Sequence, residues 1–173
     1  YVFKDNYADR LGALLSQLNR QGKLDSMVCY FGSTADPFFS FHKKFPVTMK
    51  CLDLLDHYRP GLVVVQSRSP MVIAGLPIFK SLGERLAVVI PIESHLERVI
   101  YKYTPGQSKI SERLLAADGL RAQGIVVNLA ASPLLPYGDY YKNAWEFAEL
   151  LVQHGDYISL GCLSDGSKSS ERE

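Results

Sequence analysis

Residues 47–69 read VTMKCLDLLDHYRPGLVVVQSRS, and this stretch holds one complete structural unit. Its first half carries apolar side chains at helical spacing up to Tyr58, and Pro60 prevents the helix from continuing. Its second half begins with a β-branched run at 62–65, which predicts a buried strand, and polar residues follow from Gln66 onward. The stretch therefore predicts a helix, a strand and a polar loop at the carboxyl end of that strand.

The same order of elements repeats on both sides of this unit. Strands that are apolar on both faces and separated by helices pair in parallel through right-handed crossovers. The fold class is therefore α/β with about five parallel strands, and the periodicity leaves open a doubly wound sheet or most of a TIM-type barrel. The other helices are predicted at about 6–21, 76–82, 110–123 and 141–154. The strands are predicted near 27–32, 62–67, 86–92, 125–130 and 157–161.

Composition indicates one domain with one core. The chain has 173 residues, of which 47% are hydrophobic and 21% charged, and its net charge of +1 gives no overall footprint for nucleic acid. No apolar run is long enough for a membrane span, and no secretory signal precedes the first helix, so we expect a cytoplasmic protein. We assign residues 1–163 to the domain and 164–173, which read SDGSKSSERE, to a polar tail.

The cysteines predict neither disulfides nor a metal site. Cys29, Cys51 and Cys162 are far apart, and no Cys-x-x-Cys or close Cys/His pair occurs, which favours a reducing compartment and buried thiols. No dinucleotide or Walker motif follows a strand. His95, at a strand exit, is interpreted as a partly exposed residue near a helix start, and Trp145 is interpreted as a core residue at helical spacing with Phe147.

Polar residues follow four of the predicted strands, at 32–37, 66–70, 91–95 and 130–136. The carboxyl ends of parallel strands meet at one edge of the sheet, where ligands bind in this class of fold. Small hydroxyl residues with Asp36 and Arg68 suit a small zwitterion, because Arg68 can bind a carboxylate and Asp36 an ammonium group. The alternative is that each exit only caps the helix that follows it.

Three segments carry a resemblance to a known family: FGSTADPFFSFHKKFPVTMKCLDLL at 31–55, VVVQSRSPMVIAGLPIFKSL at 63–82, and YTPGQSKISERLLAADGLRAQGI at 103–125, which a strand and SPLLP at 132–136 follow. Their order resembles the spore photoproduct lyase branch of the radical S-adenosylmethionine (radical SAM) enzymes over residues 27–140. The third segment is the most specific. The resemblance implies a partial (β/α) barrel with outer helices, whose first strand is missing from this chain.

The resemblance also implies cofactors and site residues. The family binds S-adenosylmethionine against a [4Fe–4S] cluster and forms a 5′-deoxyadenosyl radical. Lyase chemistry in DNA repair, and thus a nucleic-acid partner, follow from the resemblance alone. Arg113 matches an arginine of the family pattern, and no catalytic residue is assigned. The positions carried over are Ser33, Thr34 and Asp36 at the methionine end, Arg68 at the carboxylate in place of a lysine, Glu93 and Ser94 near the ribose, and Ala131, Ser132 and Pro133 along the adenine.

Departures from the family pattern leave three functions open. The Cys-x-x-x-Cys-x-x-Cys loop that ligates the cluster is absent, so this chain alone should bind no cluster and be inactive, with the ligands expected in a longer parent protein. Ser33 also replaces the hydrogen-donating cysteine of spore photoproduct lyase. The chain is then the core of a radical SAM enzyme, or a degenerate barrel that acts as a binding module. An unrelated hydrolase or transferase ranks last, because no nucleophile and base pair up.

Overall fold

In the part of the chain that the structure describes, five parallel strands form a single sheet. The computed structural model describes residues 6–39, 41–135, 138–139 and 141–162, and the predicted tail at 164–173 lies outside them. Neighbouring strands in the sheet are also neighbours in sequence, and every pair is parallel. All five predicted strands are confirmed. They are β1 (Val28–Phe31), β2 (Leu62–Gln66), β3 (Leu86–Pro91), β4 (Val127–Ala131) and β5 (Tyr157–Leu160).

The strand order decides between the two architectures that the sequence left open. A doubly wound sheet reverses its strand order at a switch point, whereas this sheet adds each strand to the same edge. One face is the core, where Val63, Val88 and Val127 are fully buried. On the other face Tyr30 and Tyr157 are 66% and 65% exposed. A singly wound sheet with one open face is a partial (β/α) barrel, which confirms the predicted fold class.

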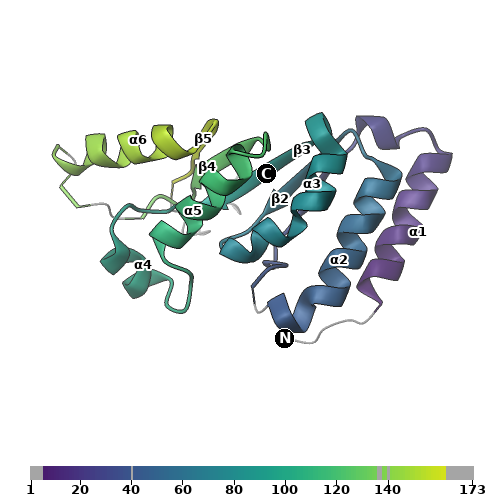
Figure 1. The fold of residues 1–173 in the computed structure, drawn as a ribbon, viewed down its shortest axis with the longest axis horizontal. Coiled ribbons are helices and arrows are strands. Elements are labelled where there is room, and N and C mark those ends of the chain that lie inside the picture. Colours follow the sequence, from purple (N-terminus) through teal and green to yellow (C-terminus); the bar gives the residue numbers. More distant parts are fainter. Residues whose placement is uncertain (1–5, 40, 136–137, 140, 163–173) are drawn as a thin grey trace, which may run out of the picture.

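The helices connect the strands and lie over the core face of the sheet (Figure 1). Those predicted at 6–21, 76–82, 110–123 and 141–154 are confirmed with small changes at their ends. Short 3-10 turns at 24–26, 70–75 and 83–85 join helices to strands. The helices are α1 (Tyr7–Arg20), α2 (Phe41–Tyr58), α3 (Leu76–Leu82), α4 (Glu97–Tyr103), α5 (Ile110–Arg121) and α6 (Asn143–His154).

Two helices differ from the prediction. Helix α2 begins at residue 41 and contains Pro46, although the sequence predicted a start at 47. Proline removes one helical hydrogen bond without forbidding the turn before it. Just after Pro46, the Thr48 hydroxyl donates to the Pro37 carbonyl (2.8 Å), which joins α2 to the turn after β1. Helix α4 was not predicted, because its buried residues, Val99 and Ile100, are adjacent and form no helical stripe.

Trp145 is not a core residue. It is 75% exposed, whereas Phe147 is 4% exposed and packs in the core. Two residues along an α-helix are separated by about 200°, so Trp145 and Phe147 face opposite sides of α6. The core side continues from Phe147 to Leu151, four residues on. The exposed side forms an open groove of about 450 Å³ lined by Trp145, Ala148, Glu149, Val152 and Gln153.

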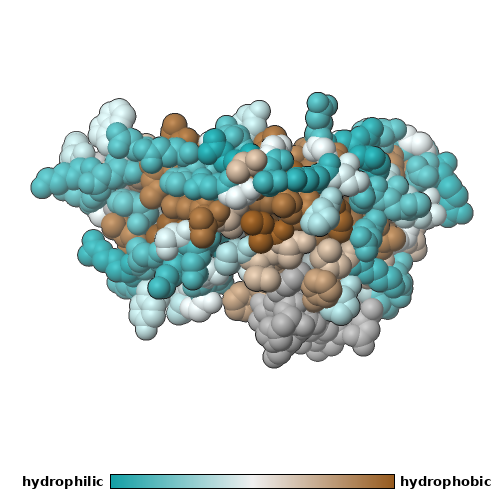
Figure 2. Space-filling view, in the orientation of Figure 1, coloured by the Kyte–Doolittle hydropathy of each residue, from teal (hydrophilic) through white to brown (hydrophobic). Residues whose placement is uncertain are grey.

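The surface carries further exposed hydrophobic side chains, including Tyr141 and Leu115. On the face that Figure 2 shows, hydrophobic residues form a band across the middle, between hydrophilic residues along the edges.

Within the described residues, no helix has both the length and the apolar character that crossing a bilayer requires.

Candidate functional site

Asp36 joins the exits of β1 and β2. Its Oδ1 accepts hydrogen bonds from the backbone N–H of Phe38 (2.9 Å) and Phe39 (3.2 Å) and from the Ser67 hydroxyl (2.8 Å). Its Oδ2 accepts one from the backbone N–H of Arg68 (2.8 Å). The first two bonds close the turn after β1, and the other two hold the loop after β2 beside it. Asp36 thus fixes the relative position of two strand exits.

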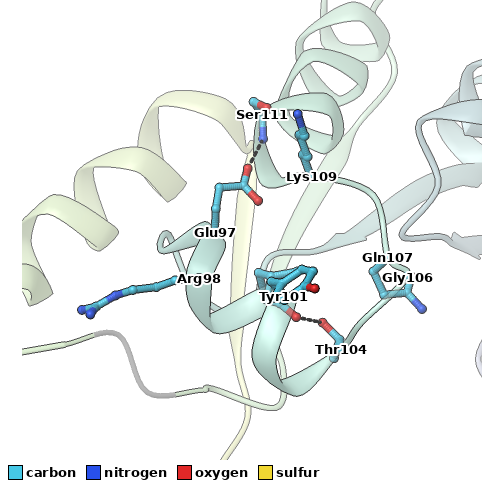
Figure 3. A pocket seen from close by; sticks show the side chains of 9 residues that line it. Glu97, Arg98, Tyr101, Thr104, Gly106, Gln107, Lys109 and Ser111 are labelled. Atoms are coloured by element: carbon cyan, nitrogen blue, oxygen red, sulfur yellow. Dashed lines mark hydrogen bonds between the residues drawn. The ribbon is translucent and has the colours of Figure 1, made fainter.

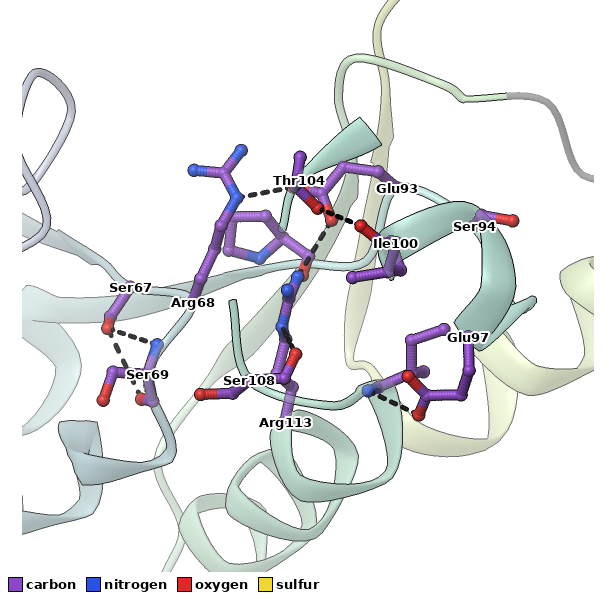
Figure 4. A network of polar contacts seen from close by, with 12 residues as sticks. Ser67, Arg68, Ser69, Glu93, Ser94, Glu97, Ile100, Thr104, Ser108 and Arg113 are labelled. Carbon is purple, nitrogen blue, oxygen red and sulfur yellow. Dashed lines mark hydrogen bonds and ion pairs between the residues drawn. The ribbon is translucent and has the colours of Figure 1, made fainter. Parts of the chain in front are cut away.

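Glu93 joins the exits of β2 and β3 through two guanidinium groups (Figure 4). Arg68 Nε donates to Glu93 Oε1 (2.5 Å), and Arg113 Nη1 donates to Glu93 Oε2 (2.9 Å). Arg113 also donates from Nη1 to the Pro91 carbonyl (3.0 Å) and from Nε to the Ser108 carbonyl (3.0 Å). The result is a chain of alternating charge, Arg68–Glu93–Arg113, that we call the arginine–glutamate triad.

The triad is buried at one end and accessible at the other. The side chains of Arg113 and Glu93 are 0% and 1% exposed, and that of Arg68 is 27% exposed. Burial lowers the pKa of the Arg113 guanidinium, and the neighbouring Glu93 carboxylate opposes this shift. Guanidinium groups stay protonated in proteins, so the three side chains carry a net charge of +1. This charge lies at the carboxyl ends of the strands.

Arg68 presents one edge of its guanidinium to the outside. Its Nε is used by Glu93, while its two terminal nitrogens make no hydrogen bond to any residue that the structure describes. Figure 4 shows these two nitrogens directed away from Glu93. Such an edge can bind a carboxylate through two parallel hydrogen bonds. Arg68 is therefore positioned to bind an anion at the edge of the sheet.

Backbone hydrogen bonds extend the connection to β4 and β5. The Leu135 N–H donates to the Glu93 carbonyl (2.9 Å), which links the exits of β3 and β4. The Leu134 N–H donates to the Gly161 carbonyl (2.6 Å), and the Gly161 N–H donates to the Ala131 carbonyl (3.0 Å). With Asp36 and the triad, polar contacts therefore run across all five strand exits. If each exit only capped its own helix, these cross-links would not be required.

The remaining predicted site residues differ in their surroundings. Ser33 and Thr34 lie in the exposed turn after β1, and Ser132, in the loop after β4, is also exposed. Ser94 is fully buried, and its hydroxyl oxygen accepts a hydrogen bond from the Leu96 N–H (3.2 Å). Ala131 is buried at the end of β4, and Pro133 follows a cis peptide bond. The structure thus connects Asp36, Arg68 and Glu93 directly, and it places Ala131 at the end of β4 and the others in the loops that follow β1, β3 and β4.

An open pocket of about 600 Å³ lies beside α4 (Figure 3), and none of the predicted site residues lines it. Glu97 borders it and accepts hydrogen bonds from the N–H groups of Ile110 (2.8 Å) and Ser111 (3.4 Å), so its carboxylate caps α5. Tyr101, which also lines the pocket, is 81% exposed. Sequence reasoning missed this pocket because it missed α4.

His95 and the cysteines show no metal-binding arrangement. The His95 ring stacks on Phe147 with centroids 5.4 Å apart, and neither ring nitrogen has a hydrogen-bond partner among the described residues. Burial raises the pKa of the Cys29 thiol and raises that of Cys51 to about 11. Cys29 lies in β1, Cys51 in α2 and Cys162 after β5, and the described part of the chain contains no cluster of metal-ligating side chains. These residues do not fit a [4Fe–4S] cluster, which needs several thiolates at one point.

Gly32 lets the first exit approach the second. Its φ is +103°, and a Cβ at this position would overlap the Gln66 carbonyl oxygen. We expect Gly32→Ala to lower the free energy of unfolding by about 2–5 kcal/mol, the sum of backbone strain and overpacking. Denaturant titration measures this change. Gly124 is the matched control, since its φ is also positive (+78°) but a Cβ there meets nothing. Equal losses for Gly124→Ala and Gly32→Ala would contradict the close approach.

Comparison with known proteins finds the same fold in solved structures. No family model matches the sequence, and no curated protein matches it. A spore photoproduct lyase variant with bound AdoMet and dinucleoside spore photoproduct is 17% identical, with a TM-score of 0.65 over 87% of this chain and 45% of that chain. SuiB of Streptococcus suis bound to S-adenosylmethionine is 11% identical, with a TM-score of 0.68 over 98% of this chain and 36% of that chain.

Both of these proteins are radical SAM enzymes, so the predicted resemblance is confirmed at the level of the fold. This chain spans less than half the length of either protein.

Proposed function

We propose that this chain is the S-adenosylmethionine-binding core of a radical SAM protein related to spore photoproduct lyase. The observation that carries the proposal is the guanidinium of Arg68, which Glu93 holds at the carboxyl ends of the strands with two terminal nitrogens directed outward. The methionine end of the cofactor carries a carboxylate that matches this edge. Both solved structures described above share the fold and contain S-adenosylmethionine.

The other strand exits would hold the rest of the molecule. Ser33 and Thr34, in the turn beside Arg68, would contact the methionine end. Ser132 is exposed beside the buried Ala131, so this loop, with Pro133, would lie along the adenine.

Asp36, Glu93 and Ser94 would support the binding site through contacts within the protein. Asp36 accepts at least four hydrogen bonds from the protein itself, so we propose that it positions the first two exits around the ammonium group as well as facing it. Both carboxylate oxygens of Glu93 are engaged by arginines, and Ser94 is buried. Glu93 and Ser94 would therefore lie beneath the ribose and support the loop that contacts it.

Radical chemistry is proposed only for a polypeptide that joins this core to a Cys-x-x-x-Cys-x-x-Cys loop. S-adenosylmethionine supplies a sulfonium bond whose reductive cleavage requires an electron from a [4Fe–4S] cluster, and the described residues offer no ligand set for one. The residues of this chain would bind and orient the cofactor. A nucleic-acid substrate is a further proposal, supported by the dinucleoside spore photoproduct in the lyase structure. The parent gene tests the proposal of radical chemistry. A Cys-x-x-x-Cys-x-x-Cys segment encoded directly upstream of this chain would indicate an enzyme core, and its absence would indicate a binding module.

Calorimetric titration of S-adenosylmethionine into the chain tests the binding proposal. Arg68→Ala should weaken binding by about 1.5–3 kcal/mol, or about 10–150-fold, the range for a hydrogen bond to a charged group. Arg68→Lys should lose less, because it keeps the charge but not the bidentate edge. Arg10, exposed on α1, is the control, and Arg10→Ala should leave the affinity unchanged. Absence of binding to the wild-type chain, or equal affinities for wild type and Arg68→Ala, would contradict the proposal.

A further inference from the structure

We infer that Arg113 is a positioning residue that makes Arg68 selective for a carboxylate-bearing ligand, acting through Glu93. This inference rests on the proposed function, because it concerns the same anion-binding edge. Arg113 does not reach that edge itself: its side chain is 0% exposed, and it projects from the first turns of α5 to the exit of β3. Its effect on a ligand must therefore pass through the carboxylate that it shares with Arg68.

Arg113 is the fixed end of the triad. Two backbone carbonyls, those of Pro91 and Ser108, hold its guanidinium from different loops, in addition to Glu93. Because three acceptors fix the group, it cannot follow a movement of Glu93. Arg68, in contrast, is bound in the triad only through Nε and is partly exposed. Because Arg113 fixes the carboxylate of Glu93, Glu93 in turn fixes the guanidinium of Arg68.

The charges in the triad give Arg113 a second effect on the ligand. Without Arg113, Arg68 and Glu93 would form a neutral pair, and an entering carboxylate would approach a second carboxylate at close range. With Arg113, the carboxylate of Glu93 is shared between two guanidinium groups, and the net charge of +1 favours an anion at Arg68. Arg113 thus offsets the negative charge that orients Arg68.

A role in stability alone does not account for this arrangement. Buried ion pairs contribute little net stability, since the cost of removing the charges from water offsets their attraction, and apolar side chains of similar volume serve as well. Arginine is also rarely fully buried. Nη2 of Arg113 is buried with no hydrogen-bond partner in the described part of the chain, which adds to the cost. The buried guanidinium is explained if its charge and its geometry are needed at Arg68.

Two ligands that differ only in the carboxylate test the inference. S-adenosylmethionine and its decarboxylated form share the sulfonium and the adenosine, so the ratio of their dissociation constants isolates the carboxylate contact. The wild-type chain should prefer S-adenosylmethionine by about tenfold or more. Arg113→Met should reduce this preference to less than about threefold, while the affinity for the decarboxylated form changes by less than about twofold. Arg113→Lys, which keeps the charge, should retain part of the preference.

A structural role would give a different result. If Arg113 only maintained the fold of the site, Arg113→Met would weaken both ligands by the same factor, and this outcome would overturn the inference. If Arg113→Met fails to fold, Arg113→Lys is compared with wild type instead. Lysine lacks the planar guanidinium, so the preference for S-adenosylmethionine over its decarboxylated form should still be lower. An unchanged preference in a folded Arg113→Lys chain would also overturn it.

A measurement without ligand separates this inference from the proposed function. Nitrogen-15 NMR of arginine side chains reports hydrogen exchange at the Arg68 Nε–H that Glu93 binds. Arg113→Lys should accelerate this exchange by about tenfold or more, because Glu93 loses its fixed partner. If the wild-type chain binds neither ligand, the proposed function is wrong, and acceleration still supports the triad. Unchanged exchange overturns the positioning role whatever the chain binds.

Discussion

Replacing Glu93 with alanine should lower the free energy of unfolding by about 3–5 kcal/mol, the largest loss that we expect from a single polar substitution. Glu93 is the common partner of Arg68 and Arg113, and its removal leaves the fully buried Arg113 charge without a counter-charge. Urea titration followed by far-UV circular dichroism measures the loss as a shift in the transition midpoint. Glu84, exposed after α3, is the control, and Glu84→Ala should stay within about 0.5 kcal/mol of wild type.

A double substitution separates the cost of an isolated charge from the value of the pair. Glu93→Leu combined with Arg113→Met replaces the buried pair with apolar side chains and should recover most of the stability that Glu93→Ala loses. If the triad serves binding, the double variant should fold and prefer S-adenosylmethionine less than wild type does, because Arg68 keeps its charge but loses the carboxylate that orients it. A double variant as unstable as Glu93→Ala would show instead that the ion pairs stabilise the fold.

Phe147→Ala should lower the free energy of unfolding by about 3–5 kcal/mol, whereas Trp145→Ala should change it by less than about 0.5 kcal/mol. The two aromatic residues lie two positions apart in α6. Phe147 is buried against the His95 ring, so its removal leaves a cavity, and the exposed Trp145 leaves none. Thermal or urea unfolding followed by far-UV circular dichroism measures both changes, since Trp145 is the single tryptophan that fluorescence would report.

The opposite order of effects would show that Trp145 packs in the core, as its sequence position first indicated. A large loss for both variants would mean that the exposed side of α6 is covered in solution. The first of these results would contradict the placement of α6 in this structure.

The alternation of helices and strands could be read from the sequence because it depends on local patterns. The run LVVVQ contains three consecutive β-branched valines and follows Pro60 and Gly61, so this strand can be predicted without knowledge of its neighbours in the sheet. Local patterns did not predict helix α4 or the start of helix α2. Helix α4 buries only two adjacent residues, and α2 includes Pro46, with Thr48 bonded to the Pro37 carbonyl, eleven residues earlier.

The candidate site also has features that the sequence predicts and contacts that it does not predict. The polar residues after each strand can be read from the sequence, and parallel pairing required those exits to meet at one edge. The folded chain was needed to show that Asp36 binds the Arg68 backbone, and that Glu93 lies between Arg68 and Arg113, 25 and 20 residues away in sequence. A hydrogen bond between such distant residues depends on strand register, helix placement and side-chain direction together. No local spacing encodes that combination, so the full burial of Arg113, and its link to Arg68, became visible only in the folded chain.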